Sequence, residues 1–231
     1  MLKNTLINRL ATKKIAIALD NLNEKVVYVG GAVVSLYIDD TAANDVRPTM
    51  DIDIVIEIST IKELEDIRQE LTEKGFIQSS EDDIVCRFRY EDIKVDVMAT
   101  KPIDWAPANP WFASGYKNLI TYNIDNIKIN CLSLPYFLAT KFSAFYSRGS
   151  TDPRTSHDFE DIVYLLNYIS NLKMQLLEAD IEVKNYLIEC FNDILNDPQK
   201  QEAIIGHLYN EEQDYRYKKI LGQITTFINN S

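Results

Sequence analysis

The character of the sequence changes at about Leu134. Upstream of this point, short runs of alternating or β-branched apolar residues are interspersed with stretches of helical spacing, whereas downstream only helical spacing remains. This order predicts an α+β fold, in which a mixed sheet with flanking helices is followed by a region built of helices alone. We therefore expect two domains, with residues 1–133 forming the sheet domain and residues 134–231 forming an all-helical C-terminal domain.

Individual elements follow from the same periodicities. Strands are predicted where apolar residues alternate or form a short run, over residues 25–29, 51–58, 84–90, 93–98, 119–122 and 127–132. Helices are predicted at residues 2–22, 32–38, 60–74, 135–148, 155–169 and 172–196, followed by two shorter ones. The polar or proline-rich stretches at residues 39–48 and 101–115 are expected to be loops.

Charge and composition narrow the classes of partner and metal. Thirty-five acidic residues against 24 basic ones give a formal net charge of -11, which opposes a broad basic face for nucleic acid but leaves a local phosphate contact open. Cys86, Cys131 and Cys190 have no CxxC spacing and are expected to be buried thiols. His157 and His207 are too few for an imidazole-ligated centre. Any metal is therefore expected to be a hard ion held by carboxylates, such as Mg²⁺.

The N-terminal segment does not have the pattern of a targeting signal. It carries basic residues, but its longest apolar run, residues 15–19, is too short for a signal peptide. No apolar run in the chain reaches the ~18 residues that a membrane span needs. We therefore expect a cytoplasmic protein with no membrane partner.

Three groups of residues stand in an order that suggests chemistry. Gly30 and Gly31 lie between a predicted strand and a predicted helix, Asp51 and Asp53 lie on the next strand, and Asp96 lies on a later one. Side chains at i and i+2 of a strand project from the same face, about 7 Å apart, so the aspartates of the pair lie close enough to share a metal cluster. Magnesium ions in such sites assist phosphoryl and nucleotidyl transfer, and glycines let the backbone approach a triphosphate closely.

Each group also has a purely structural explanation. An alternating strand always has a polar face, so Asp51 and Asp53 are equally explained as solvated residues. A glycine pair after a strand is more often simply a turn. Asp96 shares its face with Lys94 and Met98, as in an exposed strand.

The conjunction of these residues resembles the polymerase-β-like nucleotidyltransferase superfamily. The resemblance rests on Gly30-Gly31-Ala32-Val33, on Arg47-x-Thr49-x-Asp51-x-Asp53-Ile54, and on Asp96 in a later strand. It implies that Asp51, Asp53 and Asp96 are catalytic residues that hold Mg²⁺, with Mn²⁺ as an alternative. It further implies that the nucleotide is bound by Gly30, Gly31, Arg47 and Thr49.

The helical part of the chain is similar to one branch of this superfamily, the AbiEii and MenT type toxins. Lys141, in the run from residue 137 to residue 148, and Asp158, in the run from residue 156 to residue 162, match the lysine and aspartate of that branch. His157 stands where a basic residue is usual. The resemblance implies that Lys141 and Asp158 are catalytic and that Lys141 contacts nucleotide phosphates. The structural alternatives are a lysine that snorkels at a helix edge and an aspartate that caps a helix.

The resemblance covers roughly residues 25–170 and implies a magnesium-dependent nucleotidyltransferase. In it, two lobes close around an NTP, and an NMP passes to an acceptor hydroxyl on a tRNA 3′ end or a protein. The chain is then the toxin of a toxin–antitoxin pair, with an antitoxin protein as partner. The alternatives are a catalytically silent NTP- or partner-binding module of the same fold, an aminoglycoside-type enzyme, and an interaction protein that binds no nucleotide.

Overall fold

The structure is a computed structural model, and it describes residues 2–148 and 152–231. The chain divides into two compact units. Unit 1 consists of Met1–Leu36 and Asn44–Ser133, and unit 2 consists of Tyr37–Ala43 and Leu134–Ser231. The first crossing of the chain into unit 2 is therefore a short excursion that begins in the predicted helix at residues 32–38 and continues into the predicted loop at residues 39–48.

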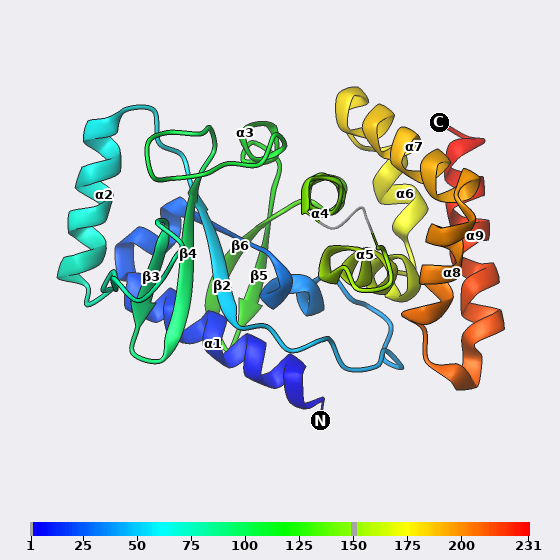
Figure 1. The fold of residues 1–231 in the computed structure, drawn as a ribbon, viewed down its shortest axis with the longest axis horizontal. Helices are drawn as coiled ribbons and strands as arrows, with labels where there is room; N and C mark the ends of the chain where they lie inside the picture. The colour runs from blue at the N-terminus through cyan, green and yellow to red at the C-terminus, as the bar shows by residue number, and fades with distance from the viewer. Residues whose placement is uncertain (1, 149–151) are drawn as a thin grey trace. The chain divides into compact units, whose positions relative to one another are not determined.

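Unit 1 is built on a six-stranded mixed sheet with the strand order β3-β4-β2-β1-β6-β5 (Figure 1). The strands are β1 (Val26–Val29), β2 (Asp51–Ile56), β3 (Arg87–Tyr90), β4 (Ile93–Ala99), β5 (Leu119–Ile124) and β6 (Ile127–Leu132). Strand β2 pairs antiparallel with β1 and parallel with β4, while β3 pairs antiparallel with β4. The predicted strands and the predicted mixed sheet are confirmed.

The register of the central strands follows from their alternation. Ile52 and Ile54 of β2 and Val95 and Val97 of β4 are buried, so the apolar face of both strands is covered. The remaining residues at the start of β2 then project from the opposite face. Asp53 is the register partner of Asp96 across the parallel pair. The fold therefore places two of the predicted catalytic carboxylates side by side.

The helical elements of unit 1 are α1 (Lys3–Leu19), the 3-10 helices η1 (Asp20–Lys25) and η2 (Gly31–Leu36), α2 (Ile61–Glu73) and α3 (Phe112–Gly115). Helix α2 begins at a capping box between Thr60 and Glu63, and Gly75 follows it with a φ of 88°. The segment after the glycine pair was expected to be an α-helix but is a short, buried 3-10 turn, because the chain leaves unit 1 at Tyr37.

In the part of unit 2 that the structure describes, all the regular elements are helices. They are α4 (Leu134–Arg148), α5 (His157–Tyr168), α6 (Leu172–Leu177), α7 (Ile181–Asn196), α8 (Pro198–Gly206), the 3-10 helix η3 (Asn210–Glu212) and α9 (Gln213–Ile228) (Figure 1). The prediction of one helix over residues 172–196 is wrong. The helix is interrupted between α6 and α7 instead. The carbonyl of Leu177, the last residue of α6, accepts a hydrogen bond from the Lys184 side chain, and the Asp180 side chain, just before α7, accepts one from the Tyr136 hydroxyl. Among the described helices, none has the length and apolarity needed to cross a membrane.

Candidate functional site

Gly30 brings the end of β1 against the aspartate pair. It follows Val29 with a φ of 75°, in the left-handed region that side chains other than glycine seldom adopt. A Cβ atom at this position would lie 1.8 Å from Oδ2 of Asp53. The position therefore needs glycine for two reasons, namely its backbone conformation and the space that the carboxylate occupies.

Gly31 makes room for the segment that precedes β2. A Cβ atom on Gly31 would lie 2.3 Å from Nη2 of Arg47 and 2.7 Å from Cγ2 of Thr49. The Arg47 guanidinium and Thr49 therefore lie directly against the glycine backbone. The structure thus brings together all four residues that the resemblance assigns to nucleotide binding in unit 1.

Helix α1 holds this segment in place. The Asp45 carboxylate accepts hydrogen bonds from the backbone N–H groups of Asn4, at 2.7 Å, and Thr5, at 2.9 Å. These belong to the first turn of α1, where N–H groups lack partners within the helix. Asn8, which is buried, accepts a hydrogen bond from the Thr49 hydroxyl at 3.0 Å. Neither Asp45 nor Asn8 was predicted from the sequence, although for Asn8 a polar residue at a buried position of a helix is a usable signal.

Two of the three predicted metal-binding carboxylates are held by an arginine that was not among the site residues predicted from the sequence. Arg87 on β3 is the register partner of Asp96. Its Nε and Nη2 atoms donate to the two oxygens of Asp96, each at 2.7 Å, and Nη2 also donates to Oδ2 of Asp51 at 2.9 Å. The hydrogen bonds to Asp96 raise the pKa of Arg87 above its usual value. Arg87 is therefore a fixed positive charge between these two carboxylates.

The chemistry of this donor set suits a hard cation, because it consists of carboxylate oxygens. The positions of these side chains in the structure, however, do not suit a cation. Among residues 2–148 and 152–231, no three histidine, cysteine or carboxylate side chains gather closely enough to hold a metal ion. Arg87 already donates hydrogen bonds to the carboxylates of both Asp51 and Asp96. A cation at this site therefore requires these side chains to rearrange.

The predicted residues of unit 2 also form a cluster. Nζ of Lys141 on α4 lies 2.6 Å from Oδ2 of Asp161 and 3.6 Å from Oδ1 of Asp158, both on α5. Arg148 contacts the other oxygen of Asp158 at 2.9 Å. Lys141 is 4% exposed and Asp161 is 3% exposed, so the ammonium group is buried in an ion pair and does not snorkel to solvent. The helix cap is Ser156, so Asp158 keeps its carboxylate for Lys141 and Arg148.

Other ionisable residues lie outside this cluster. Arg154 pairs with Asp152 and His157 lies near Glu160, and both pairs are largely exposed to solvent. The cysteines are free and buried, as expected. Burial raises the pKa of Cys86 to about 11, which makes its thiol a poor nucleophile.

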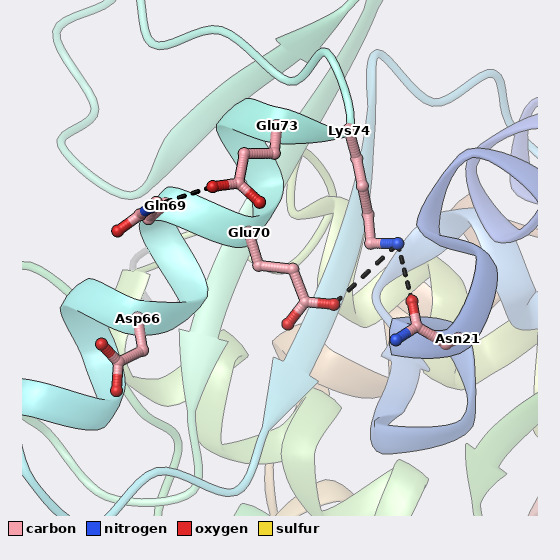
Figure 2. A pocket seen from close by; sticks show the side chains of 6 residues that line it. All are labelled: Asn21, Asp66, Gln69, Glu70, Glu73 and Lys74. Carbon is pink, nitrogen blue, oxygen red and sulfur yellow. Dashed lines mark hydrogen bonds and ion pairs between the residues drawn. The ribbon is translucent and has the colours of Figure 1, made fainter.

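A groove in unit 1 lies at the other end of the sheet from the glycine pair. It is lined by Asn21 and, on and just after α2, by Asp66, Gln69, Glu70, Glu73 and Lys74 (Figure 2). Asn21 precedes β1, whereas Gly30 follows it. Lys74 contacts Glu70 and Asn21, and Gln69 contacts Glu73 (Figure 2). The groove is open and its polar groups are largely paired with one another. It is therefore separate from the site at Gly30 and Asp53.

Comparisons with known proteins were made on sequence and on structure. The family described as nucleotidyl transferase AbiEii toxin, type IV TA system, matches residues 15–226. A solved structure of an antigenic nucleotidyltransferase-like protein from Paracoccidioides brasiliensis aligns with a TM-score of 0.47 at 18% identity, covering 85% of this chain and 91% of that chain. A comparison with curated proteins gave no significant match. Since the family match spans both units, the chain belongs to the AbiEii family of nucleotidyltransferase toxins of type IV toxin–antitoxin systems.

Proposed function

We propose that this nucleotidyltransferase moves an NMP from an NTP to an acceptor hydroxyl at the end of the sheet marked by Gly30, Asp53 and Asp96. The observation that carries the proposal is the close approach of Asp53 to the Gly30 backbone, with Asp96 beside it in register. The carboxylate of Asp53 thus lies next to the Gly30 backbone, where no side chain would fit, and Asp96 is the neighbour of Asp53 in the sheet. A triphosphate bound along Gly30 and Gly31 would lie close to the glycine backbone and to these carboxylates.

The reaction sets the roles of the surrounding residues. The oxygen of the acceptor hydroxyl attacks the α-phosphorus of the NTP, forms a P–O bond there and releases its proton to water. The bond from the α-phosphorus to the oxygen that bridges it to the β-phosphorus breaks, and pyrophosphate leaves. Negative charge accumulates on the phosphates during this exchange, and a guanidinium group stabilises it through forked hydrogen bonds. Arg47, against Gly31, is suited to this task. We propose that Thr49 supports the same nucleotide contact.

The catalytic roles of Lys141 and Asp158 rest on the match to the AbiEii branch. Lys141 is buried and faces the carboxylates of Asp158 and Asp161. A buried lysine in such a pair is a fixed charge with little freedom to move. We propose that it acts on the nucleotide as a positioned cation, with Asp158 holding it.

Mg²⁺ is the cation that we propose for this enzyme, with Mn²⁺ as its alternative, since the donors are oxygens. Asp51, Asp53 and Asp96 are the residues that we propose as its ligands. Because Arg87 holds two of them in the arrangement described above, we assign no step of the reaction to the cation.

The acceptor that we propose is a hydroxyl of a tRNA 3′ end or of a protein, and the family supports an antitoxin as a partner. The net charge of -11 favours a small docking contact over extensive wrapping of RNA.

Labelled nucleotides test the reaction and identify the substrates. The enzyme is incubated with each NTP, labelled at the α- or the γ-phosphate, and with total tRNA or a protein extract. The proposal predicts that only the α label enters an acceptor, and only in the presence of Mg²⁺ or Mn²⁺. Transfer of the γ label would indicate phosphoryl transfer instead. NTP binding in calorimetry without transfer to either class of acceptor would favour a catalytically silent module.

A further inference from the structure

Arg87 occupies the oxygens that a divalent cation would need. It donates to both oxygens of Asp96 and to one oxygen of Asp51, all within 2.9 Å. The side chains of Arg87 and Asp96 are 11% and 13% exposed, so solvent screens this pair only weakly. Bidentate pairs of this kind are among the stronger side-chain interactions in proteins. Both oxygens of Asp96 and one oxygen of Asp51 are therefore paired without any metal.

A cation and the guanidinium group cannot both use these oxygens without cost. A divalent ion bound to Asp51 and Asp96 would lie close to a fixed positive charge, and like charges repel strongly at such distances. Carboxylates released from Arg87 would carry their full negative charge toward Asp53, which lies beside Asp96 in the sheet.

We propose that Arg87 is a positioning residue that competes with the divalent cation for Asp51 and Asp96. In the metal-free protein it holds the two carboxylates and relieves their repulsion. The cation displaces at least part of this contact when it binds. Arg87 thereby sets the cation concentration that the site requires. This inference rests on the proposed function only in taking these carboxylates as cation ligands.

Arg89 provides a matched control on the same strand. It lies two positions from Arg87, so it projects from the same face of β3. It also makes a bidentate pair, with Nε and Nη2 at 2.7 and 2.9 Å from the oxygens of Asp82. Its ion-pair partner is Asp82, whereas that of Asp51 and Asp96 is Arg87. Replacing Arg89 therefore removes the same charge and the same kind of pair without releasing the predicted ligands.

The test measures Mn²⁺ binding directly, with no nucleotide and no acceptor present. The free Mn²⁺ signal in electron paramagnetic resonance is titrated for the wild type, Arg87→Gln and Arg89→Gln, and thermal unfolding is recorded in EDTA. We expect Arg87→Gln to bind Mn²⁺ about tenfold more tightly than the wild type, because a nearby positive charge is gone. We also expect it to melt at a lower temperature in EDTA and to recover when Mn²⁺ is added. Arg89→Gln should bind Mn²⁺ as the wild type does.

The inference would be overturned if Arg87→Gln bound Mn²⁺ no more tightly than the wild type, or if neither the wild type nor Arg87→Gln bound Mn²⁺. If Arg87→Gln does not fold, Arg87→Lys takes its place. Lysine keeps the charge but cannot form the fork, so one carboxylate is released and Mn²⁺ binding should tighten to a smaller degree. The transfer assay is separate, so loss of nucleotidyl transfer with intact competition for Mn²⁺ would refute the proposed function and leave this inference standing.

Discussion

At the scale of single residues, Gly30 is constrained from two directions. Its φ of 75° disfavours a side chain, and the Asp53 carboxylate fills the place where a Cβ atom would go. The sequence predicted that the glycine pair and the aspartates belong together. Arg87 could not be predicted from the sequence in the same way, because its contact with Asp51 joins residues 36 positions apart and depends on the register of three strands.

Substituting Gly30 separates steric contact from backbone strain. Gly75 also has a positive φ, of 88°, but a Cβ atom added there would lie 3.7 Å from Cε2 of Tyr90, an ordinary van der Waals contact. We expect Gly75→Ala to lower the free energy of unfolding by about 1 kcal/mol, the cost of left-handed backbone, with transfer activity unchanged. Gly30→Ala should lose activity as well, because Asp53 must move. Denaturant unfolding and transfer rates measure both effects, and equal activity in the two variants would contradict this reading.

The ion pair of Lys141 is expected to be costly to break. Lys141→Met leaves the buried Asp161 without its 2.6 Å partner, and such changes lower the free energy of unfolding by about 3–5 kcal/mol. Adding Asp161→Asn should restore part of the loss, since the uncompensated charge is removed. Urea unfolding of the single and double variants measures the coupling. Additive losses would show that the two side chains do not depend on each other.

At the scale of elements, α1 and the segment before β2 act together. Asp45 supplies hydrogen-bond acceptors to the first turn of α1, and Asn8 contacts Thr49 from further along the same helix. The helix and the strand were both predictable from their periodicity. The attachment between them was not, because Asp45 lies about 40 positions from its partners and no local pattern records such a contact.

The hydrogen bonds between Asp45 and the first turn of α1 make the free energy of unfolding depend on pH. Burial tends to raise the pKa of the Asp45 carboxyl, but the hydrogen bonds from Asn4 and Thr5 outweigh it and hold the pKa below its usual value of 3.8. The stabilisation is therefore present above that value and is lost as the pH falls through the lower pKa of the folded protein. At neutral pH, Asp45→Asn should cost about 1 kcal/mol, as for loss of a helix cap.

Denaturant unfolding at several pH values checks this expectation. The difference in stability between the wild type and Asp45→Asn should shrink as the pH drops below the ordinary carboxyl range. Asp92→Asn serves as a control, because the Asp92 side chain is 89% exposed. A constant difference across the pH range would contradict the role of the Asp45 carboxylate.

At the scale of the whole molecule, the family match extends over residues 15–226, beyond the part of the chain in which motifs are recognisable. The late helices therefore belong to the family without carrying an identifiable functional residue. The excursion of Tyr37–Ala43 into unit 2 was not predictable from a polar segment. Two interactions hold this segment in unit 2. The Tyr37 ring stacks on the Phe137 ring with their centroids 4.4 Å apart, and the backbone N–H and hydroxyl of Ser170 donate hydrogen bonds to the Asp39 carboxylate.

The most direct test of the central claim compares two aspartate variants that undergo the same chemical change. Asp53→Asn alters the carboxylate against Gly30, and Asp66→Asn alters an exposed carboxylate on α2 at the other end of the sheet. The rate of α-labelled NMP transfer is measured for both and for the wild type. We predict that Asp53→Asn slows transfer by about a hundredfold or more and that Asp66→Asn leaves the rate unchanged. A wild-type rate in Asp53→Asn would contradict the assignment of this site.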